Sequence, residues 1–387
     1  MQHLSLLIKP ASSLCNLRCK YCFYHDLSYN RDNKSYGIMQ KNVADKLIEN
    51  AVNAAGKSIT FAFQGGEPTL AGLDYFKYFT DCVNNKIAGS GKKIQVNYAI
   101  QTNGINISDG FAKFLKDNNF LVGLSLDGVK EINDYFRVDS IGEGSHGKIL
   151  KTAKLFDKLK INYNILTVIT AQVAKHIEKI YNYYKSLGFS YLQFIPCLEP
   201  LEGKNFPRRA DEDIRPYNLT PELYEKFLIN LFRLWYNDFV NGKYISIRFF
   251  DNIVRIAAGE PSEQCGTMGF CAGQFVIEAD GSVFPCDFYC VDNWKTENIL
   301  ENSFEEIYTS PNMQKFRETS YFANYSTDES EKCKSCKVFY LCRGGCRRDR
   351  DNKKDGFAGE NIYCRALYNF YVYAGPYLND VVERIKL

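Results

Sequence analysis

The chain has 387 residues, of which 45% are hydrophobic and 24% are charged, proportions typical of a globular protein with a sizeable core. Its formal net charge of +3 is too small to indicate a nucleic-acid partner or a membrane surface. The first residues lack the basic segment of a signal peptide, and no apolar run approaches the roughly 20 residues that span a bilayer. We therefore expect a cytoplasmic protein with no membrane contact.

The first predicted element is a strand, Leu4–Lys9, and three cysteines follow it closely. Cys15, Cys19 and Cys22 are spaced C-x3-C-x2-C, which suits three corners of a cubane iron–sulfur cluster. A cluster that only moves electrons normally has four protein ligands, so this spacing leaves one iron open. The chemistry that uses an open iron is reductive cleavage of S-adenosylmethionine (SAM). The alternative is half of a zinc site, but only the poorly spaced His25 stands nearby to help complete one.

Short apolar runs alternate with amphipathic segments through the first half of the chain. This alternation predicts a parallel α/β sheet, curved into a partial barrel or left open, with ligands at the carboxyl ends of its strands. The predicted strands are Leu4–Lys9, Ile59–Gln64, Ile94–Gln101, Phe120–Leu126, Asn162–Ile169 and Tyr191–Pro196. The predicted helices are Lys41–Ala54, Leu73–Asn85, Gly110–Asn118, Lys148–Leu159 and Ala174–Leu187.

Two glycine-rich runs lie among these elements. Gln64-Gly65-Gly66-Glu67-Pro68 closes the second strand, and we expect its backbone and the Glu67 carboxylate to hold the amino group of a bound methionine. The alternative is an ordinary strand-to-helix turn. A G-x-G-x-x-G match at Gly142–Gly147 follows a polar segment instead of a buried strand, so we reject a dinucleotide site and predict a loop that begins a helix.

The pattern changes after the sixth strand. A polar stretch from Pro207 to Pro216 precedes an aromatic-rich helix around Pro221–Asn241. We therefore predict three parts: a core domain over residues 1–200, a bridging segment over 201–260 and a cysteine-rich module over 261–387. The module contains a hairpin, Gln274–Tyr289, that turns at Asp280-Gly281, and it closes with a helix over Ala366–Ile385.

Fourteen cysteines in a cytoplasmic chain require an explanation other than disulfides. Eight of them crowd into the C-terminal module, and eight thiolates make two complete four-ligand sites. Two cubane clusters or a pair of structural zinc sites both satisfy this count. The eight are Cys265, Cys271, Cys286, Cys333, Cys336, Cys342, Cys346 and Cys364.

Residues 331–355 hold nine Lys and Arg against four Asp and Glu, an excess that would offset the negative charge of such clusters. The alternative interpretations of this basic segment are a nucleic-acid-binding patch and a solvent-exposed face. Asp287 directly follows Cys286, where a carboxylate is placed to accept a proton. Its alternative role is a hairpin-end carboxylate satisfied by nearby amides.

Four stretches together resemble one family. They are Lys9–His25 (KPASSLCNLRCKYCFYH), Phe61–Leu70 (FAFQGGEPTL), Pro285–Tyr289 (PCDFY) and Cys342–Arg348 (CRGGCRR). The chain resembles the radical SAM enzymes with a SPASM-type C-terminal extension, and most closely the anaerobic sulfatase-maturating enzymes. The resemblance implies a partial (β/α)6, TIM-like radical SAM barrel, a C-terminal cysteine-rich SPASM domain and a closing helix.

The resemblance also implies a role for individual residues. The N-terminal triplet would ligate the SAM cluster, and Asp287 would be the catalytic base. The positions that contact SAM in the family are occupied by Tyr21, Gly66, Ser125, Arg137 and Leu198. A first auxiliary 4Fe-4S cluster would be held by Cys265, Cys271, Cys286 and Cys346, and a second by Cys333, Cys336, Cys342 and Cys364. No ligand role falls to Cys82, Cys197 and Cys290.

The implied reaction oxidises a Cys or Ser side chain of a sulfatase polypeptide to Cα-formylglycine, with a flavodoxin- or ferredoxin-type electron donor and an anaerobic setting. The sequence leaves the choice between Cys and Ser open. One departure is Asn133, which stands where relatives often carry a His. The rival readings are a SPASM-type maturase that cross-links a ribosomal peptide and, outside enzymes, an electron carrier or a zinc-organised binding module.

Overall fold

The protein is described by a computed structural model over residues 1–199, 218–320, 328–351 and 359–386. Within these ranges one nine-stranded sheet has the order β7-β6-β5-β4-β3-β2-β1-β8-β9. Neighbouring strands are parallel except for β8 and β9. The strands are β1 (His3–Ile8), β2 (Ser58–Phe63), β3 (Gln95–Thr102), β4 (Leu121–Ser125), β5 (Tyr163–Ile169), β6 (Tyr191–Pro196), β7 (Ser246–Ile247), β8 (Phe275–Ile277) and β9 (Val283–Phe284).

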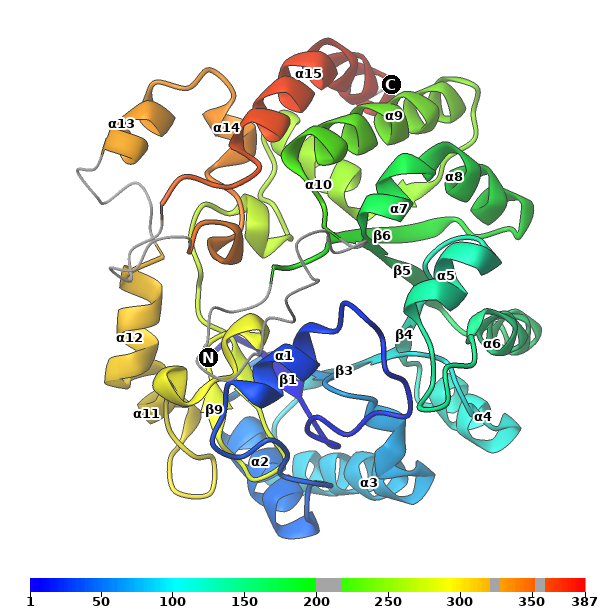
Figure 1. Cartoon of the computed structure of the whole chain (residues 1–387). Helices are drawn as coiled ribbons and strands as arrows, with labels where there is room; N and C mark the ends of the chain where they lie inside the picture. The colour runs from blue at the N-terminus through cyan, green and yellow to red at the C-terminus, as the bar shows by residue number, and fades with distance from the viewer. Residues whose placement is uncertain (200–217, 321–327, 352–358, 387) are drawn as a thin grey trace.

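Helices surround the outer face of the curved sheet (Figure 1). The first six strands follow one another in chain order, as right-handed βα units do, and the sheet stays open because β7 and β9 form its two edges. The helices are α1 (Phe23–Tyr29), α2 (Lys41–Ala54), α3 (Leu73–Ser90), α4 (Asp109–Asp117), α5 (Lys130–Phe136), α6 (His146–Leu159), α7 (Ala171–Lys175), α8 (Ile177–Ser186), α9 (Pro221–Val240), α10 (Arg248–Ala257), α11 (Phe304–Thr309), α12 (Pro311–Glu318), α13 (Asp328–Lys334), α14 (Phe339–Cys342) and α15 (Cys364–Lys386).

The α/β prediction is confirmed, and the reasons are local. In α4, for example, the Ser108 hydroxyl accepts a hydrogen bond from the Phe111 amide, and the helix buries an apolar stripe that includes Phe111 and Leu115. One predicted helix, Ala174–Leu187, is instead two. His176 leaves helical geometry at φ −115°, so α7 ends there and α8 begins.

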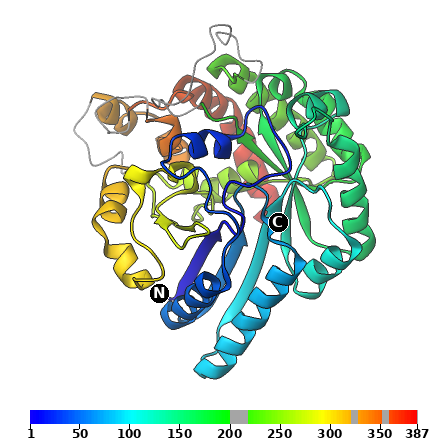
Figure 2. The same ribbon diagram turned by 60° about the horizontal axis from the view of Figure 1, so that its bottom comes forward.

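The cysteine-rich module shares the main sheet. The predicted hairpin is confirmed as β8 and β9, with Gly281 at φ 87° in its turn. Beyond the prediction, β8 also pairs with β1 in parallel, with Leu6 opposite Phe275 and Ile8 opposite Ile277. The hairpin therefore extends the barrel sheet past its first strand, which places the module beside the mouth of the barrel. Figure 2 shows the C-terminal segments and the barrel side by side.

The closing helix α15 packs along α9 and against α10, with Phe232 and Phe370 at the contact. Among the described helices, none combines the length and apolar content needed to cross a bilayer. The predicted boundary at residue 200 and the polar stretch from Pro207 to Pro216 lie outside the described residues.

Candidate active site

The loop that carries Cys15, Cys19 and Cys22 runs from β1 to α1 and is fastened on both sides by backbone hydrogen bonds. On one side the amides of Gly66 and Glu67 donate to the carbonyls of Ser12 (2.9 Å) and Leu14 (2.7 Å). On the other side the amides of Arg18 and Lys20 donate to Val138 (2.6 Å) and Phe136 (3.0 Å). The three thiols are thus held at the carboxyl edge of the sheet, between the ends of β2 and α5.

Gly66 is required by this close approach. A Cβ atom there would lie 2.1 Å from the Leu14 carbonyl oxygen, which is well inside van der Waals contact. The glycine therefore makes room for the cysteine loop, as well as for any ligand that reaches this edge.

Glu67 does not have the role that the sequence suggested. Its buried carboxylate accepts hydrogen bonds from the Thr69 amide and hydroxyl (3.0 and 2.7 Å), the Thr102 hydroxyl (2.8 Å) and the Asn103 amide (2.7 Å). Burial raises its pKa, and these hydrogen bonds partly offset the shift. Because its oxygens are already taken by the ends of β2 and β3, the carboxylate organises the edge and is not free to hold a methionine amino group.

Tyr21, Ser125 and Arg137, three of the residues predicted to contact SAM, lie around the Asp127 turn after β4. The Arg137 guanidinium donates to Asp127 Oδ2 at 2.9 Å, and the Tyr21 hydroxyl donates to the same oxygen. Ser125 ends β4 and accepts a hydrogen bond from Gln101 at 3.1 Å. Tyr21 lies between Cys19 and Cys22, so its phenol ties the cysteine loop to this buried ion pair at the edge of the sheet.

Asn133, which stands where relatives often carry a His, holds this turn in place by hydrogen bonds. It is fully buried, its side-chain oxygen accepts from the Asp127 amide at 3.1 Å, and its side-chain NH2 donates to the Ser145 hydroxyl at 3.1 Å. Leu198, the remaining SAM position, is half-buried two residues after β6.

The triplet suits a cluster in its donor chemistry. Burial raises the pKa of Cys15 to about 11 and that of Cys19 to about 12, and it also raises the pKa of Cys22. The charges of Cys15 and Cys22 add to the upward pKa shift of Cys19, and that of Cys22 adds to the upward pKa shift of Cys15, so the three sulfurs lie close together. Thiolates this buried need a cation beside them, and iron binding would replace their protons. The Leu17 amide already points at Cys15 Sγ at 3.4 Å, in the manner of amides that donate to cluster sulfurs.

Asp287, the predicted base, is brought to the mouth of the barrel. It begins a 3-10 turn (Asp287–Tyr289) after β9 and is 6% exposed. Its Oδ2 accepts hydrogen bonds from the Tyr24 hydroxyl at 2.6 Å and from the side-chain NH2 group of Gln64 at 3.2 Å. Gln64 also donates to the Tyr24 oxygen at 2.6 Å. A carboxylate from the C-terminal module thus meets two barrel side chains that stand next to the cysteine loop and to Gly66.

The other side of Asp287 faces a buried group of charges. Oδ1 is closed to solvent and makes no hydrogen bond, but it lies 3.1 Å from Lys9 Nζ. The same ammonium lies 3.7 Å from Glu278, which Arg31 pairs with at 2.6 Å. Burial lowers the pKa of Lys9, but Cys290, Asp287 and Glu278 raise it, with a net upward shift.

The eight C-terminal thiols gather into two sets in the described residues. The pKa of Cys286 is raised by burial first and then by the charges of Cys346, Cys271 and Cys265, so these four are neighbours. The pKa of Cys342 is raised by burial and by Cys333 and Cys336, and that of Cys364 is raised by burial, by Glu360 and by Cys333. These charge contacts support the two groups of four that the resemblance implies, and their assignment to cubane clusters stays a prediction.

Basic side chains accompany both sets, as the excess of Lys and Arg over residues 331–355 suggested. Burial raises the pKa of Cys271 and of Cys333, and nearby guanidinium charges offset part of the shift, those of Arg347 and Arg350 at Cys271 and that of Arg350 at Cys333. Arg347 and Arg350 are buried, which argues that these two serve internal charge balance, whereas Lys332, Lys334 and Lys337 of the same run are exposed. Among the described residues, no three His, Cys, Asp or Glu side chains are arranged around a single metal ion. In a cubane cluster each cysteine binds a different iron, so the four sulfurs do not surround a single ion.

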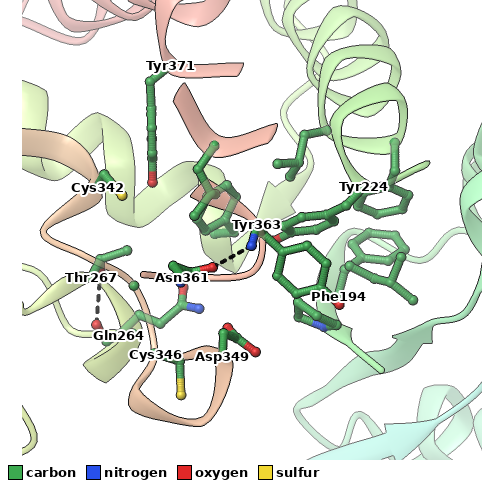
Figure 3. Close-up of a pocket in the computed structure, with 18 of the residues that line it drawn as sticks. Phe194, Tyr224, Gln264, Thr267, Cys342, Cys346, Asp349, Asn361, Tyr363 and Tyr371 are labelled. Carbon is green, nitrogen blue, oxygen red and sulfur yellow. Dashed lines mark hydrogen bonds between the residues drawn. The ribbon is translucent and has the colours of Figure 1, made fainter. Parts of the chain in front are cut away.

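A cavity of about 100 Å³ lies where the two cysteine sets approach the barrel (Figure 3). Phe194 of β6 and Tyr224 of α9 form one wall, and Cys342, Cys346 and Asp349 form another. Burial raises the pKa of Asp349 to about 6, although Arg348 and Arg350 lower it. None of the five predicted SAM residues lines this cavity. It therefore belongs to the region between the sets and not to the site around Asp287.

Sequence reasoning assigned no role to Lys9, Tyr24, Gln64 or Asp127, which complete the site. Lys9, Gln64 and Asp127 lie at the ends of predicted strands, and Tyr24 stands in the quoted stretch Lys9–His25, so these positions were the available signal. Their partners could not be read from the sequence, since each contact joins segments far apart in the chain.

Comparisons with known proteins agree with this geometry. Residues 10–184 match the Radical SAM superfamily, and residues 265–337 match an iron-sulfur cluster-binding domain, SPASM. A "Cysteine-type anaerobic sulfatase-maturating enzyme" of Clostridium novyi is 45% identical over 371 residues, covering 96% of this chain and 95% of that protein. A "Serine-type anaerobic sulfatase-maturating enzyme" of Bacteroides thetaiotaomicron is 26% identical over 391 residues, covering 99% and 92%.

Among solved structures, "Native anSMEcpe with bound AdoMet and Cp18Cys peptide" superposes with a TM-score of 0.89. It is 43% identical in sequence, and the match covers 99% of both chains. The similarity thus extends over the barrel, the bridge and the cysteine-rich module together.

Proposed function

Because this chain belongs to the anaerobic sulfatase-maturating enzymes of the radical SAM superfamily, we propose that it oxidises a Cys side chain of a sulfatase polypeptide to Cα-formylglycine. The identity of 45% to a cysteine-type enzyme, against 26% to a serine-type enzyme, supports Cys as the target. The structure that shares 43% identity holds a peptide whose description contains Cys, which agrees with this choice.

The observation that supports the proposal best is the location of Asp287. A carboxylate from the cysteine-rich module lies 2.6 Å from Tyr24 and 3.2 Å from Gln64 of the barrel, next to the loop of the three N-terminal thiols. A base that takes the thiol proton of a substrate must stand where the Cβ hydrogen is removed, and this contact brings both halves of the protein to one point.

We assign the cofactor ligands as follows. Cys15, Cys19 and Cys22 would hold a 4Fe-4S cluster with one open iron, and the two four-thiol sets would each hold an auxiliary 4Fe-4S cluster. When bound, these clusters and SAM supply one-electron transfer and a radical that removes a Cβ hydrogen. The side chains assigned to SAM are Tyr21, Gly66, Ser125, Arg137 and Leu198.

The protein's own share of the reaction is positioning and proton transfer. With a Cβ hydrogen atom and one electron removed by the chemistry of the bound groups, Asp287 would accept the thiol proton of the substrate cysteine. This leaves a thioaldehyde, which water would hydrolyse to the aldehyde and hydrogen sulfide. The Asp127–Arg137 pair orients groups at the SAM edge, and the hydrogen bonds of the cysteine loop hold its backbone between the ends of β2 and α5.

We further propose a core domain over residues 1–200, a bridge over 201–260 and an auxiliary-cluster module over 261–387. A cytoplasmic, anaerobic setting with a flavodoxin- or ferredoxin-type electron donor completes the proposal.

The test uses anaerobically reconstituted enzyme with SAM, a reductant and a sulfatase peptide containing Cys-x-Pro-x-Arg, beside its Ser counterpart. We expect 5′-deoxyadenosine and an aldehyde that forms a hydrazone, with the Cys peptide preferred. Asp287→Asn should lower the aldehyde formed per 5′-deoxyadenosine by at least tenfold, and Asp292→Asn, a change in the exposed loop nearby, should not. SAM cleavage without aldehyde from either peptide would contradict the sulfatase assignment, and a cross-linked peptide product would point to a peptide maturase.

A further inference from the structure

The residue that holds the inner oxygen of Asp287 is Lys9, and nothing in the assignments above gives it a role. It follows β1 directly, and its amide donates to the Ile277 carbonyl of β8 at 2.8 Å. Its side chain is 2% exposed. The first strand of the barrel and the hairpin of the cysteine-rich module thus fix the base of this side chain before its ammonium meets any partner.

The ammonium of Lys9 lies among groups from both halves of the protein. It is 3.1 Å from Asp287 Oδ1, 3.1 Å from Cys290 Sγ and 3.7 Å from Glu278. It also stands 4.9 Å from the centre of the Tyr24 ring. At neutral pH Cys290 is a thiol, because burial raises its pKa to about 12. The two carboxylates are therefore the anions that hold the Lys9 charge.

The charges in this group balance. Arg31 forms an ion pair with Glu278 at 2.6 Å. The carboxylate nearer to the Lys9 ammonium is that of Asp287, at 3.1 Å against 3.7 Å for Glu278. An unpaired charge this deeply buried would be costly, so the pairing is strongly constrained. Removing Lys9 would leave Oδ1 of Asp287 without any partner among the described residues.

The two oxygens of Asp287 are consequently different. Oδ1 is sealed from solvent and faces the ammonium, whereas Oδ2 faces Tyr24 and Gln64 at the barrel mouth. A carboxylate that could rotate freely would not distinguish them. The Lys9 ammonium beside Oδ1, and the Tyr24 and Gln64 donors beside Oδ2, fix Oδ2 as the oxygen that faces the barrel mouth.

We propose that Lys9 is a positioning residue for the base, holding Oδ1 of Asp287 so that Oδ2 is the oxygen presented to the substrate thiol. This inference rests on the proposed function. It differs from a purely structural role, in which Lys9 would only tie the barrel to the C-terminal module. The structural role predicts loss of stability and of iron, and the positioning role predicts loss of coupling between SAM cleavage and product.

The test is Lys9→Met in the reconstituted enzyme, which keeps the length of the side chain and removes the charge. We expect 5′-deoxyadenosine formation within about threefold of the wild type, and at least a tenfold fall in aldehyde formed per 5′-deoxyadenosine. The double variant Lys9→Met/Asp287→Asn should fall no further than Asp287→Asn alone, because residues that act as a unit are not additive.

Lys185→Met is the matched control. Lys185 makes the same kind of contacts, 2.7 Å from Asp238 and 4.9 Å from the centre of the Tyr181 ring, but it lies between α8 and α9. Its ratio of aldehyde to 5′-deoxyadenosine should match the wild type. Lys9→Gln, which keeps a hydrogen-bond donor without the charge, is measured in parallel in case Lys9→Met loses iron.

Three results decide the matter. An unchanged ratio in Lys9→Met or in an iron-replete Lys9→Gln would overturn the inference. A fall of aldehyde in step with iron content and SAM cleavage in both variants would also overturn it, in favour of the structural role. A wild-type enzyme that yields no aldehyde would instead refute the proposed function itself.

Discussion

The three thiols of the N-terminal loop lie within residues 15–22, whereas the eight thiols of the C-terminal module come from segments spread between Cys265 and Cys364. Backbone hydrogen bonds to the ends of β2 and α5 hold the N-terminal loop whether or not metal is present. The C-terminal sets join segments that are far apart in the chain: the 3-10 turns at Cys265 and after Cys286, the short helices α13 and α14, and the first residue of α15. We infer that the barrel loop keeps its shape without iron, whereas the module, whose distant segments the clusters would join, depends more on iron for its stability.

The largest effect is expected at the N-terminal loop. Cys19→Ala should abolish SAM cleavage, by at least about a thousandfold, because the loss of one of three ligands leaves no stable cluster with a single open iron. The melting temperature should change little, since the loop keeps its backbone hydrogen bonds. The assay measures 5′-deoxyadenosine and iron, which should fall by about four of about twelve atoms per chain.

Cys82→Ala is the control for this experiment. Cys82 is a half-buried thiol of α3 that belongs to none of the three sets. Its substitution should leave both iron content and SAM cleavage unchanged. Substantial SAM cleavage by the Cys19 variant would break the distinction between the two regions.

Gly66→Ala should have the next largest effect. The added methyl would lie 2.1 Å from the Leu14 carbonyl oxygen, a backbone atom that cannot simply rotate away. We expect the cysteine loop to shift and SAM cleavage to fall about ten- to a hundredfold, because a displacement of about 1 Å can cost a hundredfold. Gly89→Ala, in α3 with no atom within 4 Å of the added carbon, should be silent or slightly stabilising.

Cys346→Ala probes the other region. The first four-thiol set should lose its cluster, so aldehyde per 5′-deoxyadenosine should fall at least tenfold while SAM cleavage changes by less than about threefold. Because this set joins segments near residues 265, 286 and 346, the melting temperature should fall further than in Cys19→Ala. An equal or smaller fall would show that the C-terminal module, like the barrel, folds without its iron.

The same contrast explains what could be predicted. The alternation of strands and helices and the cysteine triplet depend on neighbours in sequence, and they predicted β1 to β6 and the cluster loop. The pairing of β8 with β1 could not be predicted, because three-residue strands carry almost no periodicity. The division of eight cysteines into two sets followed from family resemblance and not from spacing. Glu67 was assigned wrongly, since its partners Thr102 and Asn103 lie on the next strand and loop.

The smallest effect is expected at Asn133, on the barrel side of the comparison. Its amide oxygen accepts from the Asp127 amide and its NH2 group donates to Ser145, and a neutral imidazole offers one acceptor and one donor as well. Asn133→His should therefore keep aldehyde formation within about threefold. Asn133→Leu removes both of these hydrogen bonds and leaves the buried backbone amide of Asp127 unsatisfied. It should therefore lower the free energy of unfolding by about 1–3 kcal/mol. Urea unfolding of both variants measures the difference. If the His variant were as unstable as the Leu variant, Asn133 would be fitted to this turn by its shape and not by its hydrogen bonds, and the residue common in relatives would be incompatible with this barrel.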